Sequence, residues 1–418
     1  MNNIYIKSIY IKELRHLKDI SINIDNNEKK NLIITGRNGS GKTTLLEAIK
    51  SYLRFFESTD TPLEYRKDAS KKLSSLQNEL KQIEYNHILA PEDKKIKINQ
   101  IKNSINLSKS WIESYGNWID LDISMVELIQ NAYRNGEIIF SYFDAKRNSN
   151  VTIPTGVEKV TLNEKYPIDA KPSANFLKYL VDLKTQQSFA KNEGDFDESN
   201  KIELWFKKFE NALRDIMDNP NLSLKFDYKN YNFTINEEGK IPYGFNELSD
   251  GYSAILDIIM DLIMRMENKA SRAYDLEGIV LIDEVEAHLH ISLQKKILPF
   301  LTKLFPNVQF IVTTHSPFIL NSIENAVIYD LENKTNVKDL TAYSYEGIVE
   351  EYFNIDQYSQ SIKDKLNRYK KLIFKNNTTK EEDAEMEYLR KYLSEVSEEE
   401  APELYAEFMD LELHRKLM

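Results

Sequence analysis

The 418-residue sequence contains no cysteine. This absence excludes a disulfide-bonded scaffold, a thiolate metal site and a cysteine nucleophile, and it fits a reducing compartment. No apolar run approaches the roughly 20 residues that a membrane-spanning helix needs. The first residues alternate isoleucine and tyrosine with polar residues and lack the apolar core of a signal peptide. We therefore expect a soluble, cytoplasmic protein with no membrane association.

The net charge of −11 arises from 66 acidic and 55 basic residues. Residues 381–412 hold thirteen acids against only Arg390 and Lys391, a deficit equal to the whole net charge. Encounter with nucleic acid depends on local fields, so the acidic total does not exclude a nucleic-acid partner near the rest of the chain. The acidic segment is either a solvated helical face or a docking surface for a basic partner.

Apolar residues recur with the period of β-strands early in the chain and form continuous runs later. Alternation over residues 4–24 predicts two strands joined near Arg15 and His16. Residues 31–35 predict a short buried strand before the glycine-rich turn and before the two apolar runs. These last two runs, residues 278–282 and 308–312, are continuous and typical of parallel strands covered on both faces. A helical pattern at 291–304 separates the last two runs. Together they predict a βαβ unit and an α/β fold.

Residues 64–112 change to leucine and isoleucine at spacings of three and four. Two such runs are separated by Pro91, which favours an antiparallel helical hairpin inserted at about 60–116. The hairpin is expected to project as a short coiled coil, and two amphipathic helices lying on the main body are the alternative. From about residue 340 onward the pattern indicates only helices and turns.

A P-loop pattern, Gly36-Arg-Asn-Gly-Ser-Gly-Lys-Thr43, lies between a predicted strand and a predicted helix. Its glycines let backbone N–H groups face phosphates, and the helix N-terminus adds favourable partial charge. Lys42 is expected to reach the β- and γ-phosphates, and the Thr43 hydroxyl to ligate Mg²⁺. The predicted nucleotide-binding residues are Gly36, Asn38, Gly39, Ser40, Gly41, Lys42, Thr43 and Thr44.

Two acids follow the apolar strand near residue 280. Asp283 is predicted at the carboxyl end of this strand, where doubly wound sheets bind ligands, and it would hold Mg²⁺ through water. Glu284 would orient or deprotonate the attacking water. Acids are also favoured at helix N-termini, but the P-loop upstream favours the catalytic interpretation.

Two further segments carry polar residues next to predicted elements. His315 follows a buried strand and could hydrogen-bond the γ-phosphate, or it is an ordinary loop histidine. Ser249 and Gly251 precede an apolar helix, where serine is a common N-cap. The same geometry also suits an anion that arrives from another subunit. His288 and His290 form no metal-ligand cluster with the other histidines.

Four motifs follow one another along the chain: the P-loop, the segment of Ser249 and Gly251, the pair Asp283-Glu284, and the segment of His315. The set, in this order, resembles the ATP-binding cassette head of the SMC/RecF-like branch. The resemblance implies an ABC-type P-loop NTPase head with N-terminal antiparallel strands, a short helical-hairpin insertion and a helical C-terminal region. It also implies a homodimer or higher homo-oligomer in which two heads enclose two ATP molecules. Lys42, Thr43, Asp283, Glu284 and His315 would then act in one subunit, with Ser249 and Gly251 acting in trans.

The resemblance narrows to the ATPase-subunit family of Septu anti-phage systems, PtuA, which also occurs in certain retrons. It rests on Phe176–Gln186, Leu248–Leu256, Asp283–His290 and Tyr343–Phe353. Members of this family are paired with an HNH nuclease (PtuB-like) and are thought to license it. The sequence departs from the wider cassette pattern at Asp250 and Tyr252, and no glutamine follows the strand predicted at 137–143.

We therefore expect an ATPase that uses ATP and Mg²⁺ as a switch on a partner nuclease in anti-phage defence. A DNA-repair or chromosome-maintenance ATPase acting directly on DNA is the alternative. The predicted domains are an ATPase head at 1–335 and an acidic helical region at 336–418.

Overall fold

The computed structural model describes residues 4–25, 27–57, 63–85, 91–115, 118–123, 126–147, 151–268, 274–337, 347, 360–375, 377–397 and 401–417. The chain forms two compact units, Met1–Ala342 and Tyr343–Met418. The domain boundary expected at residue 335 stays a prediction.

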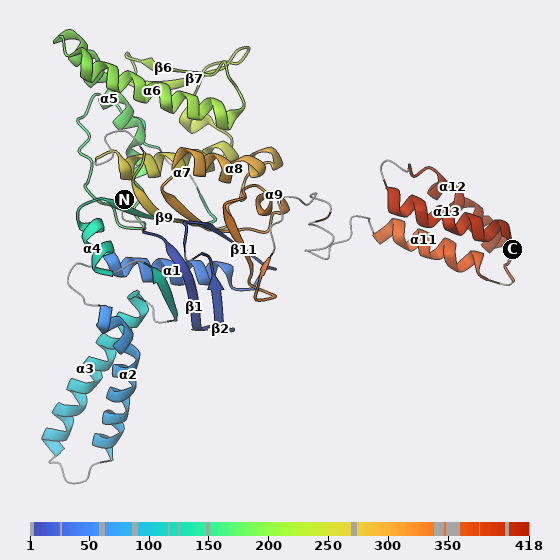
Figure 1. Ribbon diagram of the computed structural model, residues 1–418, viewed down its shortest axis with the longest axis horizontal. Coiled ribbons are helices and arrows are strands. Elements are labelled where there is room, and N and C mark those ends of the chain that lie inside the picture. The colour runs from blue at the N-terminus through green and yellow to red at the C-terminus, as the bar shows by residue number, and fades with distance from the viewer. Residues whose placement is uncertain are drawn as a thin grey trace. The chain divides into compact units, whose positions relative to one another are not determined.

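A six-stranded sheet forms the centre of the first unit (Figure 1). Its strand order is β12-β11-β3-β10-β9-β5, and the neighbours are parallel except for β11 and β12. The strands are β3 Asn31–Thr35, β5 Ile138–Phe143, β9 Glu277–Ile282, β10 Val308–Thr313, β11 Ala326–Asp330 and β12 Thr335–Val337. Helix α8, Ile291–Leu304, connects β9 to its parallel neighbour β10, so the predicted βαβ unit is confirmed. Parallel strands end at one edge, which brings the segments after β3, β9 and β10 together.

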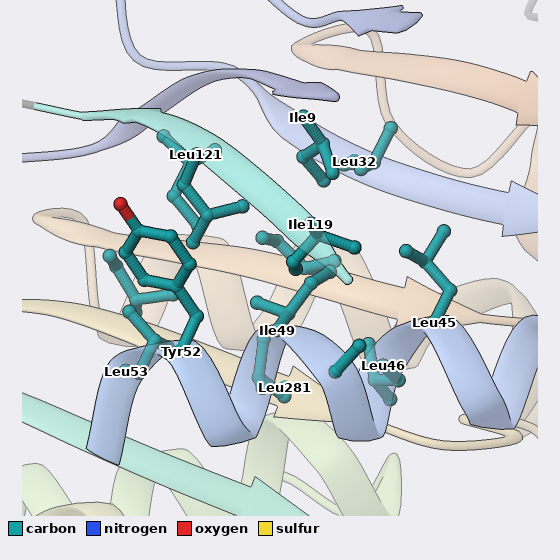
Figure 2. Packing of buried hydrophobic residues seen from close by; sticks show 14 of the residues in the cluster. Ile9, Leu32, Leu45, Leu46, Ile49, Tyr52, Leu53, Ile119, Leu121 and Leu281 are labelled. Carbon is teal, nitrogen blue, oxygen red and sulfur yellow. The ribbon is translucent and has the colours of Figure 1, made fainter. Parts of the chain in front are cut away.

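Helix α1, Lys42–Glu57, packs between this sheet and an antiparallel sheet of order β2-β1-β4. The strands of the second sheet are β1 Ile6–Leu14, β2 Leu17–Asn23 and β4 Ile119–Ile123. Figure 2 shows side chains of α1 and of strands from both sheets in one core: Ile9, Leu32, Leu45, Leu46, Ile49, Tyr52, Leu53, Ile119, Leu121 and Leu281. Burying each large apolar side chain stabilises the fold by about 1.5–3 kcal/mol. The core thereby fixes the start of α1 relative to both sheets.

Helix α7, Asp250–Met266, is buried on nearly all sides, which explains its continuous apolar sequence. It contacts β5, α8 and α5, Phe176–Asn192. Beyond α7 and α8, Figure 1 shows α6, Phe196–Met217, with β6 and β7. Strands β6, Ser223–Asp227, and β7, Asn232–Asn236, form a small sheet with β8, Tyr243–Gly244. This unit also contains four short helices: η1 Pro172–Asn175, η2 Phe245–Glu247, α4 Val126–Arg134 and α9 Pro317–Leu320.

The helical hairpin expected at about 60–116 is present as α2, Leu63–Glu84, and α3, Pro91–Tyr115. The two helices pack against each other, and α3 also contacts α1. Figure 1 shows the hairpin as an arm that extends from the end of α1. Pro91 begins α3, where its fixed φ and missing N–H are tolerated.

The second unit contains α11, Gln360–Ile373, α12, Lys380–Ser394, and α13, Pro402–Leu417. These helices share a core of their own that includes Tyr369. The buried Glu412 carboxylate accepts hydrogen bonds from Tyr369, Arg390 and Arg415. Although burial raises the pKa of Glu412, these hydrogen bonds outweigh it and lower the pKa. The acidic segment is therefore part of a folded helical unit.

Candidate nucleotide-binding site

The P-loop connects β3 to α1 through backbone conformations that favour glycine. Gly36 has a φ of +133° and Gly41 a φ of +100°. A Cβ at Gly36 would also lie 2.9 Å from Ser40 Oγ and 3.2 Å from Glu332 N. Both conformation and space therefore require glycine at residue 36.

Lys42, the first residue of α1, extends back over the P-loop. Its Nζ donates hydrogen bonds to the carbonyls of Gly36, at 2.8 Å, and Arg37, at 3.1 Å. Burial lowers the pKa of the ammonium group, and nearby acids led by Glu284 partly oppose that shift. The P-loop thus places a buried cation at the N-terminus of α1. The cation and the helix N-terminus both favour binding of an anion such as phosphate.

Asp283 joins α1 to the ends of β9 and β10. Its Oδ2 accepts a hydrogen bond from Thr43 Oγ1 at 2.9 Å, and its Oδ1 accepts one from Thr313 Oγ1 at 2.6 Å. Its backbone N–H donates to the Phe143 carbonyl at 2.8 Å. A hydroxyl beside a carboxylate is a set of hard oxygen donors of the kind that Mg²⁺ prefers, so the residues present fit this ion.

Glu284 has a left-handed backbone, with a φ of 44°, directly after Asp283. Its N–H donates to Thr313 Oγ1 at 2.7 Å. A non-glycine residue in this conformation costs about 1–3 kcal/mol unless the surroundings determine it. The hydrogen bond to β10 is part of what holds the backbone there.

His315 follows β10 and is tied to the segment after β9. The backbone N–H of His315 donates a hydrogen bond to Glu286 Oε1 at 2.5 Å. Burial and the neighbouring Lys42 lower the pKa of the imidazole, although the acids around it oppose this shift. The neutral imidazole is therefore favoured at neutral pH, and it can donate one hydrogen bond and accept another.

A cavity of about 200 Å³ brings most of the predicted site residues together. It is lined by Arg15, His16, Asn38, Gly39, Gly41, Lys42, Thr43, Thr44, Glu284 and His315. A second cavity of about 340 Å³ shares Arg15 and Thr44 with the first and is also lined by Trp118. Six of the eight predicted P-loop residues thus share this cavity with Glu284 and His315, whereas Gly36 and Ser40 do not line it. Asp283 contacts the cavity through Thr43.

Sequence reasoning did not include Arg15 and His16 among the site residues. They occupy the turn between β1 and β2, where Arg15 has a φ of 55°. His16 Nε2 lies 3.0 Å from the Ser40 carbonyl. Arg147 was also missed. The sequence signal that could have indicated Arg15 is a basic residue at the turn between the first two predicted strands, shortly before the P-loop.

Ser249 and Gly251, predicted to act in trans, are not among the residues that line the 200 Å³ cavity. Ser249 precedes α7 and makes no side-chain capping hydrogen bond. Gly251 packs within its own chain, because a Cβ there would lie 2.9 Å from the His288 carbonyl oxygen. His288 has a left-handed φ of 67°, so the loop after Glu284 closely approaches α7. Their action in trans stays a prediction.

Replacing Gly251 with alanine should displace the loop that contains His288. We expect Gly251→Ala to lower the free energy of unfolding by about 1–3 kcal/mol, because the backbone atom in its way cannot rotate aside. Thermal unfolding of Gly251→Ala and Ser249→Ala measures the effect. The exposed Ser249 is the matched control, with an expected change within about 0.5 kcal/mol. Equal stability of both variants would contradict the close packing of Gly251.

The fold and the site are those of a P-loop nucleotide-binding protein. The chain belongs to the family described as AAA domain, putative AbiEii toxin, Type IV TA system, whose model matches residues 32–321. It is similar to the Septu protein PtuA of Bacillus mycoides (strain KBAB4), with 33% identity over 157 residues, 35% of this chain and 22% of that protein. It is also similar to the Retron Ec83 probable ATPase of Escherichia coli, with 33% identity over 158 residues, 35% of this chain and 28% of that protein.

The chain therefore spans about a quarter of the length of these two relatives. A solved structure, the SmcHead bound to the C-winged helix domain of ScpA, matches with a TM-score of 0.37 and 13% identity over 79% of this chain and 96% of that chain. The resemblance to Septu and retron ATPases inferred from the motifs is thus confirmed.

None of the helices in the described ranges is long and apolar enough to cross a membrane. The described residues also contain no group of three or more histidine, aspartate or glutamate side chains that could hold a metal ion.

Proposed function

We propose that this chain binds and hydrolyses ATP and uses the cycle as a switch on a partner nuclease in anti-phage defence. One observation supports hydrolysis most directly. The Thr43 hydroxyl contacts the Asp283 carboxylate at 2.9 Å, next to the cavity that holds Lys42, Glu284 and His315. Phosphoryl transfer to water requires a cation, hard oxygen donors for Mg²⁺ and a carboxylate near the attacking water. Lys42, the pair of Thr43 and Asp283, and Glu284 can supply these groups.

Each side chain has a separate task in this proposal. Lys42 binds the β- and γ-phosphates, and the backbone N–H groups of the P-loop orient them. Thr43 and Asp283 hold Mg²⁺, which when bound neutralises phosphate charge. Glu284 orients the attacking water and accepts its proton, while His315 donates a hydrogen bond to the γ-phosphate.

The switch would operate through association of two copies. Ser249 and Gly251 begin a helix whose N-terminus favours an anion, which suits the nucleotide of a second copy. ATP would therefore favour the dimer or a higher homo-oligomer, and hydrolysis would release it. The names of the relatives, a Septu protein and a retron ATPase, support a role in defence. An HNH nuclease (PtuB-like) is the proposed partner, with nucleic acid as its substrate.

The second unit offers a surface for such a partner. Two residues of α12, Glu381 and Tyr388, and its C-cap residue, Glu395, are spaced by seven residues and so lie near one face of the helix. Tyr388 is 62% exposed, and both glutamates are exposed or partly exposed. An exposed tyrosine between acids suits a basic protein surface.

Reversing two charges on this face tests the partner proposal. The double variant Glu381→Lys, Glu395→Lys should recover at least about tenfold less nuclease on co-purification from the native host, with ATP affinity unchanged. Mass spectrometry identifies the partner and quantifies it. Glu193→Lys with Glu238→Lys makes the same charge change at two exposed acids of the first unit and serves as the control. Equal recovery with both double variants would exclude this face as the docking surface.

A further inference from the structure

Arg147 lies beyond the end of β5 and is only 4% exposed. Its guanidinium donates to three consecutive backbone carbonyls. Nη1 contacts the Asp283 oxygen at 3.1 Å, and Nη2 contacts the Glu284 oxygen at 2.7 Å and the Val285 oxygen at 3.3 Å. Among the described residues, all of its hydrogen bonds go to backbone carbonyls of this one segment.

These carbonyls belong to the segment where the chain leaves the central sheet. β9 ends at Ile282, so residues 283–285 no longer have a full set of ladder partners. The N–H groups of Glu284 and Val285 are held by β10, through Thr313 Oγ1 at 2.7 Å and the Thr313 carbonyl at 3.0 Å. Arg147 holds the carbonyl side of the same residues. The left-handed Glu284 is therefore fixed from both sides.

The charge of Arg147 also fits this place. Burial lowers its pKa, while Glu286, Asp144, Asp257 and Asp283 all favour the charged form. A guanidinium keeps its proton in proteins, and its planar fork can reach several acceptors at once. Lysine would retain the charge but offers a compact ammonium with no such fork. The geometry, and not only the charge, therefore distinguishes arginine at this position.

We propose that Arg147 is a positioning residue for ATP hydrolysis, which holds the backbone of residues 283–285 so that the Glu284 carboxylate faces the nucleotide cavity. The inference rests on the proposed function. Arg147 does not line the cavity and acts through Glu284. It should therefore affect turnover much more than nucleotide affinity, because it contacts neither Lys42 nor Thr43, and at Asp283 it contacts the backbone carbonyl and not the carboxylate that Thr43 meets.

The test compares Arg147→Lys with Arg265→Lys in the full chain. Arg265 is the control, because it is a buried arginine that also binds backbone carbonyls, those of Phe140, Tyr166, Pro167 and Ala170, and differs from Arg147 in its ion pair with Asp261. Arg147→Lys should lower kcat for ATP about 10- to 100-fold, since displacing a catalytic group by 1 Å can have that effect. Affinity for a labelled, non-hydrolysed ATP analogue should stay within about threefold. Arg265→Lys should lower thermal stability without this selective loss of kcat.

A second variant separates positioning from folding. In Arg147→Ala, millimolar guanidinium should restore part of kcat, and tetramethylammonium at the same concentration should not, because only guanidinium can donate to the carbonyls. Normal kcat in folded Arg147→Lys overturns the inference. Failure of both Arg147 variants to fold also overturns it, since the role would then be structural. If the wild type itself hydrolyses no ATP, the proposed function fails first, and the two failures are distinguishable.

Discussion

Lys42→Ala should reduce the affinity for ATP by about 100-fold or more. A hydrogen bond to a charged group contributes about 1.5–3 kcal/mol, and the ammonium can contact more than one phosphate oxygen. In the structure, Lys42 Nζ is held over the P-loop by the carbonyls of Gly36 and Arg37. A phosphate at the helix N-terminus would meet this cation and the N–H groups of the loop at the same place.

Titration of a fluorescent ATP analogue measures this loss, and Lys29→Ala is its matched control. Lys29 is partly buried whereas Lys42 is buried, but its Nζ also donates to two carbonyls, those of Pro306 and Val308, and burial also lowers the pKa of its ammonium group. Both variants lose similar intramolecular hydrogen bonds, so their stabilities should change alike. Only Lys42→Ala should lose nucleotide binding. Affinity within about threefold of the wild type would remove the P-loop assignment.

The parts of the site that follow a local rule were predictable from sequence. The strand–glycine loop–helix pattern around Lys42 needs only neighbouring residues, and so does the apolar strand that ends at Asp283. The contact between Thr43 and Asp283 then follows because parallel strands end at one edge of the sheet. The alternation of the first strands and the spacing of the helical hairpin were equally local signals.

Residues that act through the backbone of a distant segment were not predictable. Arg147 belongs to a polar stretch with no periodicity, and its partners, the carbonyls of residues 283–285, have no side-chain identity. The constraint on Gly251 arises from the carbonyl of His288, which no pattern around Gly251 reveals. The short strands β11 and β12 were also missed. Their pairing depends on β3 and on each other rather than on a long apolar run.

Glu284→Gln should retain ATP binding and slow hydrolysis by about 100- to 10,000-fold. The amide keeps the size of the side chain but cannot accept a proton from water. The backbone contacts from Thr313 and Arg147 do not involve the carboxylate, so the substituted side chain should keep its direction. Glu277→Gln, at the opposite end of β9, makes the same charge change, and its amide oxygen can still accept from the Ile4 N–H. Turnover of this control should match the wild type.

The same variant distinguishes a hydrolysis defect from a binding defect in the switch. If hydrolysis opens the ATP-bound dimer, slower hydrolysis must lengthen its life, and the associated fraction at saturating ATP should rise. Gel filtration with ATP compares Glu284→Gln with the wild type, while Lys42→Ala should remain dissociated under the same conditions. If Glu284→Gln binds ATP but associates no more than the wild type, Glu284 is not the residue whose chemistry limits the lifetime of the dimer. Slow turnover in the same variant would still identify Glu284 as the catalytic carboxylate, and hydrolysis would then not be the step that opens the dimer.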